Sequence, residues 1–305
     1  MAKKDLQPDQ VPDLKPGHYS DGHPLDEVHY LESKIILKGE RFTSVESFRE
    51  FSKLVRRAAE KSDVDFETKE VEGLRPQIRE VLFLDTKDFK LYNNAFILRR
   101  RITYQDGFLV GDPEIVFKFR HPDMQKAAEM DVRANISGDY RIKFKAEALP
   151  LKDRIGGYRL LFSHNVEFPL SAVHEKDRTS MATLLRVLPA LRVLKTSKTD
   201  RVELVNATAV EEVLQELGTL GFGKGVDAKS NAAVWRTRGD QKQLVGEFSF
   251  QCKFHKKSDF HEKAMDRCKQ FFSTVQHVAQ DWVSLGTTKT GAVYRLRGNP
   301  PRAHE

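Results

Sequence analysis

Several segments of this chain alternate charged and apolar residues, the pattern of a β-strand with one polar and one apolar face. The clearest is 247–254, with the sequence Glu-Phe-Ser-Phe-Gln-Cys-Lys-Phe. Successive side chains of a strand point to opposite faces, so Glu247 and Lys253 share one face while Phe248 and Phe250 share the other. The alternation recurs at Glu32/Lys34, Arg99/Arg101, Lys118/Arg120 and Glu129/Asp131/Arg133. So many strands with acids or bases on one face predict a barrel or deep sheet whose charged side surrounds a charged ligand.

Length and composition set the outer limits. With 305 residues, of which 39% are hydrophobic and 31% charged, the chain can bury a sizeable core and has the composition of a soluble globular protein. A net charge of +7 permits an anionic ligand or nucleic acid without requiring one. Cys252 and Cys268 suggest no disulfide framework, so a reducing, cytoplasmic location is expected. No apolar run approaches the ~18 residues of a membrane-spanning helix, and the N-terminus lacks the apolar stretch of a signal peptide.

Turn signals and apolar stripes predict an arm, one domain and a tail. Residues 1–27 hold four prolines and no periodicity, which indicates a disordered N-terminal arm, and 297–305 is expected to be a flexible tail. The domain between them, 28–296, is too rich in strands for a doubly wound parallel sheet, so an antiparallel sheet or barrel with helices around it fits better. Strands are predicted near 28–38, 79–85, 95–104, 114–120, 128–136, 140–149, 158–162, 191–195, 201–205, 231–238 and 244–254, and helices near 43–55, 179–188, 208–218 and 259–285.

The charged strand faces suggest a chemistry. Burying an unpaired charge costs several kcal/mol, so charged inward faces need pairing, a metal or a ligand. Carboxylates suit Mg²⁺ or Mn²⁺, and arginine forks suit phosphate oxygens. Acids and arginines around one interior therefore describe a metal–polyphosphate site. An antiparallel sheet with one face in water shows the same alternation without any function, and this alternative stays open. The apolar faces of 115–119 and 248–254, which the helix at 259–285 can cover, favour the closed sheet.

Particular motifs resemble the CYTH domain of the triphosphate tunnel metalloenzyme superfamily. Phe83-Leu84-Asp85-Thr86, followed by Leu98-Arg99-Arg100-Arg101, is similar to its Tyr-Phe-Asp-Thr … Ala-Leu-Arg-x-Arg stretch. Weaker matches follow in the same order at 30–34 (Glu-x-Glu-x-Lys), 116–118, 129–131, 199–201 and 246–249, so the resemblance covers about 28 to 255. It implies an α+β fold, an antiparallel eight-stranded β-barrel, or tunnel, with helices packed outside.

The resemblance also implies a function. Members use Mg²⁺ or Mn²⁺ and act on triphosphates; they include inorganic triphosphatases, thiamine-triphosphatase, class IV adenylyl cyclases and fungal-type RNA triphosphatases. It assigns substrate phosphates to Lys34, Arg99, Arg101, Lys118, Arg120, Arg133 and Arg201, and the metal to Glu32, Glu129, Asp131 and Glu247. Two positions depart from the pattern, because Tyr30 replaces the first glutamate of Glu-x-Glu-x-Lys and Ser249 replaces the second glutamate of the late strand. No particular carboxylate is assigned a catalytic role.

Three functions follow from these observations. The first is a metal-dependent phosphohydrolase that releases phosphate from a triphosphate. The alternative is a non-catalytic module that binds polyphosphate or a nucleotide with a degraded metal site, as Tyr30 and Ser249 suggest. The third, a nucleic-acid-binding protein, is the weakest, because aromatic residues do not interleave with the bases on one face. No membrane partner is expected. Asp85 is expected to cap a turn, Arg100 to point outward, and the alternating charges at 143–147 are not placed.

Overall fold

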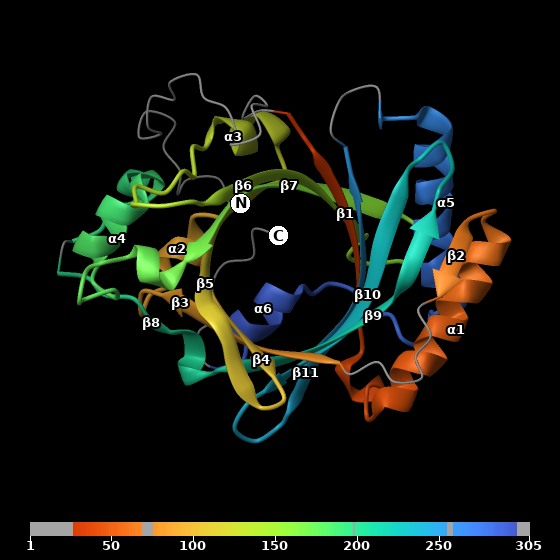
Figure 1. Ribbon diagram of the computed structural model, residues 1–305, viewed down its shortest axis with the longest axis horizontal. Helices are drawn as coiled ribbons and strands as arrows, with labels where there is room; N and C mark the ends of the chain where they lie inside the picture. The colour runs from red at the N-terminus through yellow and green to blue at the C-terminus, as the bar shows by residue number, and fades with distance from the viewer. Residues whose placement is uncertain (1–26, 69–75, 198, 255–258, 298–305) are drawn as a thin grey trace.

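A closed β-barrel forms the centre of the molecule (Figure 1). The structure, a computed structural model, describes residues 27–68, 76–197, 199–254 and 259–297. The strands of the ring pair in the order β9-β10-β11-β1-β6-β7-β5-β4-β3, and β3 pairs with β9 to close it. They are β1 (Tyr30–Leu37), β3 (Gln77–Asp85), β4 (Phe96–Gln105), β5 (Phe108–His121), β6 (Arg141–Pro150), β7 (Tyr158–Pro169), β9 (Val210–Gly221), β10 (Asp227–Thr237) and β11 (Gln243–Lys253). Two short strands, β2 (Asp65–Thr68) and β8 (Glu203–Leu204), pair with β9 and β3.

The ring has nine strands, which corrects the predicted eight. Strands β1 and β6 run parallel, with Tyr30 opposite Lys145 and Glu32 opposite Glu147, whereas the other neighbours in the ring are antiparallel. Direction alternates around a ring of antiparallel neighbours, so such a ring needs an even number of strands. A ring of nine must therefore contain a parallel pair, and the barrel is mixed rather than wholly antiparallel.

Two helices cover one side of the barrel. Helices α1 (Val45–Lys61) and α5 (Glu262–Val278) lie side by side against the outer faces of β9, β10, β11 and β1, at the right of Figure 1. The ring of Phe271 lies 5.4 Å from that of Phe250 on β11. Phe271, Phe272 and Val275 are all buried in this cluster, so the helix predicted at 259–285 covers the apolar face of 248–254. The helix packs on the apolar strand faces, so the charged faces of these strands line the inside.

A second apolar cluster covers the opposite side, at the left of Figure 1. Helix α4 (Met181–Val187), the 3-10 helix η4 (Pro189–Val193) and residues 130–134 pack on the outer faces of β4, β5 and β7. Leu98, Phe117 and Val166 supply the strand side of this cluster. The remaining short elements are α2 (Lys90–Asn93), α3 (Met124–Glu129), η2 (Gly39–Arg41), η3 (Leu170–Ala172) and η5 (Val205–Ala207).

A short C-terminal helix lies inside the ring in Figure 1. Val293 and Tyr294 of this helix, α6 (Lys289–Tyr294), are fully buried. They pack with inward side chains, most of which lie near one end of their strands: Ile36, Val81, Phe83, Ile97, Val210, Trp235 and Val245. Tyr294 stacks on Tyr92 with ring centroids 4.1 Å apart, and its hydroxyl donates to Asp85 Oδ2 over 3.1 Å. This end of the interior is therefore an apolar floor, and α6 is the one described helix that departs from the prediction of helices packed outside.

Three predicted elements are wrong. The segment 128–136 forms no strand, because α3 runs to Glu129 and residues 130–136 follow it without regular structure. The segment 208–218 is strand β9 rather than a helix, because pairing with both β10 and β3 overrides its local helical preference. Residues 191–195 belong largely to η4. The predicted arm over 1–27 and tail over 297–305 lie outside the described residues, apart from Glu27 and Arg297.

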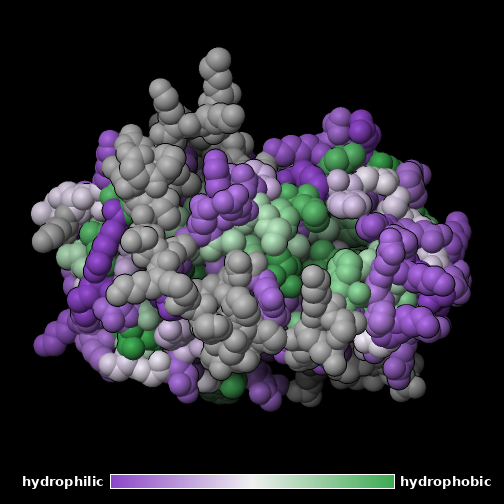
Figure 2. All heavy atoms as spheres, turned by 90° about the horizontal axis from the view of Figure 1, so that it is seen from above, coloured by the Kyte–Doolittle hydropathy of each residue, from purple (hydrophilic) through white to green (hydrophobic). Residues whose placement is uncertain are grey.

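Some apolar surface is left on the outside of the barrel. A groove of about 350 Å³ between β1, β6, β7 and α5 is lined by residues such as Leu31, Ala148, Leu160 and Phe272. Figure 2 shows apolar side chains gathered in the middle of the face seen from above, between hydrophilic areas. Within the described part of the chain, no helix has the length and apolar character to cross a membrane.

Removing the Phe271 ring should destabilise the barrel. Phe271 is fully buried against Phe250 and Phe248, so Phe271→Ala should lower the free energy of unfolding by about 3–5 kcal/mol. Urea denaturation of this variant and of Gln270→Ala, at an exposed position of the same helix, measures the difference. Equal stability of the two variants would show that α5 does not hold the sheet.

Candidate functional site

The structure brings together seven of the predicted site residues on the inner face of the barrel. Strand register places Arg99 opposite Phe83 and Val116, and Lys118 opposite Ile97 and Asn165, so each shares a face with its neighbours on the adjacent strands. The seven residues are Glu32, Lys34, Arg99, Arg101, Lys118, Arg120 and Glu247. The Asp-Thr … Leu-Arg-x-Arg stretch therefore places its first and third arginines inside, and Arg100, opposite Leu82 and Ile115, outside.

Glu147, on β6, is the centre of the densest ion-pair cluster. Its Oε1 lies 2.8 Å from Lys118 Nζ and its Oε2 lies 3.2 Å from Lys34 Nζ and 3.6 Å from the Arg120 guanidinium. The Ser163 hydroxyl donates to Oε1 over 2.6 Å. Burial alone would raise the pKa of Glu147, but the three cations outweigh it and hold this pKa well below its usual range. Glu147 is therefore a buried carboxylate that is ionised at neutral pH.

Glu32 shares this cluster. Its Oε2 lies 3.0 Å from Lys34 Nζ and 3.2 Å from Lys145 Nζ. Burial opposes ionisation of both Glu32 and Lys34, but the surrounding opposite charges prevail, lowering the pKa of Glu32 and raising the pKa of Lys34. Both groups are charged at neutral pH, and Lys34 joins two carboxylates.

Lys118 shows that positive charge is in excess here. Burial lowers the pKa of this lysine to about 7, and repulsion from Lys34, Arg120 and Arg99 adds to that effect. The attraction of Glu147 opposes the shift without cancelling it. An added anion near Lys118 would favour its charged form.

A second layer of ion pairs lies toward the open end of the barrel. Glu114 accepts from Arg101 and Arg141, each over 2.9 Å, and Glu167 accepts from Lys143 over 2.8 Å. Burial alone would raise the pKa of Glu167, but Lys143, followed by Lys145 and Arg101, lowers it to about 2. Glu167 is therefore ionised at neutral pH as well.

Arg99 stands apart from these pairs. Among the residues that the structure describes, it makes no ion pair or side-chain hydrogen bond, and its Nε is buried without a partner. Burial, and then repulsion from Arg101, lower the pKa of Arg99 to about 10, which leaves it charged at neutral pH. The Nε atoms of Arg79 and Arg101 are also buried without hydrogen bonds in the described part of the chain. These guanidinium groups have donors free for an anion.

The described interior and its rim hold more bases than acids. Counting only the ion-pair network of the described residues together with Arg99, six carboxylates meet ten basic side chains: Glu32, Glu114, Glu147, Glu167, Glu212 and Glu247 against Lys34, Arg79, Arg99, Arg101, Lys118, Arg120, Arg141, Lys143, Lys145 and Lys289. Unbalanced charge of one sign costs free energy in a protein interior unless a counter-ion joins it. The arrangement therefore suits a ligand with several negative charges.

The acids do not form a metal site. No group of three or more His, Cys, Asp or Glu residues is placed to hold a metal ion within the described ranges. Glu247 Oε1 lies 2.8 Å from Lys289 Nζ, which also lies 3.1 Å from Glu212 Oε1. Glu32 and Glu147 are held by lysines and an arginine in the same way. The residues present therefore do not fit the Mg²⁺ or Mn²⁺ that the resemblance implies.

Four predicted site residues lie outside the barrel. Glu129 ends α3, is exposed and accepts from Gln125, while Asp131 and Arg133 pair with each other in the segment that follows. Arg201 pairs with Asp177 at the surface over 2.7 Å. The prediction that 128–136 is a strand had placed the first three inside. Asp85 accepts from the backbone N–H groups of Thr86, Leu91 and Tyr92, so its predicted turn-capping role is confirmed.

The sequence interpretation missed several interior residues. Lys143, Lys145 and Glu147 alternate on β6, and that alternation was the available signal. Glu167 and Asn165 on β7 also alternate, but the strand was expected to end at 162. Glu212 was hidden by the helix prediction, and nothing local marked Lys289 as an interior residue.

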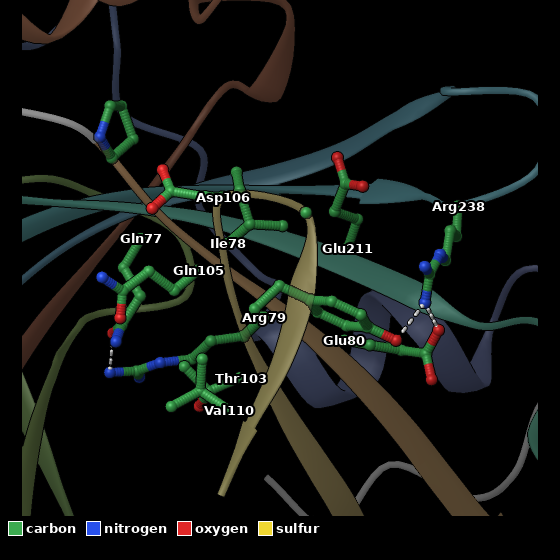
Figure 3. A pocket seen from close by; sticks show the side chains of 13 residues that line it. Gln77, Ile78, Arg79, Glu80, Thr103, Gln105, Asp106, Val110, Glu211 and Arg238 are labelled. Atoms are coloured by element: carbon green, nitrogen blue, oxygen red, sulfur yellow. Dashed lines mark hydrogen bonds and ion pairs between the residues drawn. The ribbon is translucent and has the colours of Figure 1, made fainter.

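Open space adjoins the charged interior at the rim. A pocket of about 650 Å³ is lined by the start of β3, the β4–β5 hairpin and Arg238 (Figure 3). Arg79 hydrogen-bonds Gln77 on one side of it, while Arg238 donates to the Tyr104 hydroxyl over 3.0 Å and pairs with Glu80 on the other. Arg79 also lies 3.6 Å from Glu212 in the interior, whereas Glu80 and Glu211 of the pocket lining are on the outer face of the wall.

Comparison with known proteins gives structural neighbours only. No protein-family model and no curated protein sequence matches the chain. A solved structure from Hippeastrum, described as a proposed adenylyl cyclase with a dominant triphosphatase activity, is 11% identical at a TM-score of 0.42, covering 90% of this chain and 98% of its own. A proposed adenylate cyclase from Bacillus halodurans is 12% identical at a TM-score of 0.39, covering 86% and 95%. A Pyrococcus horikoshii protein is 10% identical at 0.34, covering 86% and 96%.

Because of the ion pairs of the interior, the free energy of unfolding should fall as the pH is lowered into the acid range. Burial alone would raise the pKa of Glu212, but Lys289, Arg101 and Arg79 and a hydrogen bond from Trp235 lower it to about 2. A depressed folded-state pKa contributes stability that is complete above the ordinary value of 4.5 and is lost as the pH falls toward about 2. For Glu212 the loss is roughly 3 kcal/mol.

Urea denaturation between about pH 6 and about pH 3 tests this, because Glu212→Gln should lose less unfolding free energy over this range than the native chain. Exposed Glu262→Gln on α5 is the matched control and should change nothing. An identical pH dependence in Glu212→Gln and the native chain would contradict the assigned pairing.

Proposed function

We propose that the barrel interior binds a polyphosphate-type anion, with a triphosphate chain as the simplest member of the class. The observation that carries the proposal is Arg99, a largely buried guanidinium without a counter-ion among the described residues, within an interior where bases outnumber acids. Guanidinium groups bind phosphate oxygens through pairs of parallel hydrogen bonds. Lys34, Arg101, Lys118 and Arg120 lie on the same inner face and supply further cations for successive phosphates.

Binding without hydrolysis is the form of the proposal that the geometry favours. A hydrolase of the kind implied by the resemblance needs carboxylates that hold a metal and orient a water molecule. Each of the six carboxylates of the ion-pair network already accepts from one or more cationic side chains. Glu129 and Asp131, which were predicted to complete a metal site, lie outside the barrel. Tyr30 and Ser249 offer neutral oxygens in place of two further acids.

Replacement of Arg99 should weaken binding of inorganic tripolyphosphate. Arg99→Ala removes a hydrogen-bonding cation from the interior, so the binding free energy should fall by about 1.5–3 kcal/mol. Isothermal titration calorimetry measures it, and Arg100→Ala is the matched control because its side chain points away from the interior. If both variants bind tripolyphosphate as the native chain does, Arg99 is not part of a phosphate site.

A phosphate-release screen decides between a binding module and a hydrolase. The native protein should bind tripolyphosphate and yet release no phosphate from tripolyphosphate, nucleoside triphosphates or thiamine triphosphate with either Mg²⁺ or Mn²⁺. Sustained turnover that Glu147→Gln abolishes would establish the hydrolase instead. Binding of single-stranded RNA that is tighter than that of tripolyphosphate, and that weakens steeply with salt, would favour the nucleic-acid alternative.

A further inference from the structure

Lys289 places a positive charge between two interior carboxylates. Its Nζ lies 2.8 Å from Glu247 Oε1 and 3.1 Å from Glu212 Oε1, whose side chains are each 6% exposed. Both glutamates belong to the barrel wall, on β11 and β9, whereas Lys289 is the first residue of α6. Glu247 is one of the residues that the sequence resemblance assigns to a metal. In this chain the ammonium group of Lys289 contacts the Glu247 carboxylate instead.

The third side of this position is aromatic. Lys289 Nζ lies 4.7 Å from the centroid of the Trp235 ring, and Trp235 Nε1 donates to Glu212 Oε1 over 2.7 Å. An ammonium ion gains from an indole face as well as from carboxylates. A hard divalent cation takes oxygen ligands and finds none on the indole side. The surroundings are therefore matched to an ammonium rather than to Mg²⁺ or Mn²⁺.

Lys289 is held in place by the rest of α6. The Thr288 hydroxyl caps the helix by accepting from Gly291 N–H over 3.0 Å. Asn206 Nδ2 donates to the Val293 carbonyl over 2.7 Å and to the Tyr294 carbonyl over 3.0 Å. Together with the Tyr294–Asp85 hydrogen bond, these contacts fix the helix at the apolar floor. The lysine is thus a fixed part of the interior and not a mobile surface side chain.

We propose that Lys289 is a built-in cation that takes the place of a divalent metal at Glu212 and Glu247. The interior consequently binds its polyphosphate as the metal-free anion and not as a metal chelate, a statement about the ligand that rests on the proposed function. The charge balance agrees with this. A divalent cation would enter beside an ion-pair network that, counted with Arg99 over the described residues, already has four more bases than acids, and it would be repelled, whereas a free polyanion is attracted.

Metal binding by the ligand-free protein tests the substitution directly. Mn²⁺ should leave the Tm of the native chain unchanged, because Lys289 occupies the carboxylates. In Lys289→Ala the freed Glu212 and Glu247 should bind Mn²⁺ and raise Tm by about 2–4 °C at roughly five times the Kd. The double variant Lys289→Ala/Glu247→Gln should lose this rise, and exposed Lys269→Ala should behave as the native chain. If Mn²⁺ raises the Tm of the native protein and Glu247→Gln abolishes this rise, the proposal is overturned. This outcome can be measured even if Lys289→Ala does not fold.

Titration of tripolyphosphate into the native protein tests the form of the ligand. Affinity should be the same in EDTA as in untreated buffer, and excess Mg²⁺ should weaken binding by sequestering the free anion. Binding that appears only when Mg²⁺ is added overturns the metal-free assignment while leaving phosphate binding intact. If tripolyphosphate does not bind under either condition, the proposed function is wrong. The replacement of a metal by Lys289 is then judged from the Mn²⁺ experiment alone.

Discussion

The enclosure of many charged side chains by a closed sheet is the constraint on which this structure depends. A charge inside a barrel cannot turn to bulk water, so it must find an opposite charge or lose its ionisation. Glu147 meets this requirement by contacting Lys34, Lys118 and Arg120 at once, and Glu32 by contacting Lys34 and Lys145. The same network leaves net positive charge in the interior, because the acids compensate only part of the charge of the bases. Lys118, with a pKa lowered to about 7, and Arg99, without a described partner, mark where compensation is incomplete.

The apolar floor explains how such an interior is compatible with a stable fold. Along the strands, charged inward residues give way to Ile36, Val81, Phe83, Trp235 and Val245, which pack with Val293 and Tyr294 of α6. On the outside, α1, α5 and α4 cover apolar strand faces with two large clusters. Hydrophobic burial therefore occurs on both outer sides and at one end of the barrel. The charged layer is confined to the remaining interior.

The sequence predicted those features that neighbouring residues determine and missed those that depend on contacts between distant parts of the chain. Period-two alternation located β1, β4, β5 and β11 and put seven of the eleven predicted site residues inside, because strand alternation is a local property. The nine-strand ring was not predictable in this way, since the parallel β1–β6 pair joins residues that are far apart in sequence. Thr208 to Gly218 has helix-like signals, but its partners β3 and β10 make it a strand. Lys289 carries no sequence signal, because only the tertiary position of α6 brings it to Glu247.

The two departures from the family pattern fit the same electrostatic account. Tyr30 stands where the pattern has an acid, and the Nζ atoms of Lys145 and Lys253 lie 5.9 Å and 6.0 Å from the centroid of its ring. Ser249 stands where the pattern has another acid, directly opposite Lys34 in the β1–β11 ladder. A glutamate at either position would pair with these lysines and reduce the excess positive charge by one. The two substitutions therefore do more than remove metal ligands, because they place neutral side chains beside Lys34, Lys145 and Lys253 where the pattern has acids. Together with Lys289 at Glu247, they describe an interior in which cationic side chains have taken over the charge that a metal ion would supply.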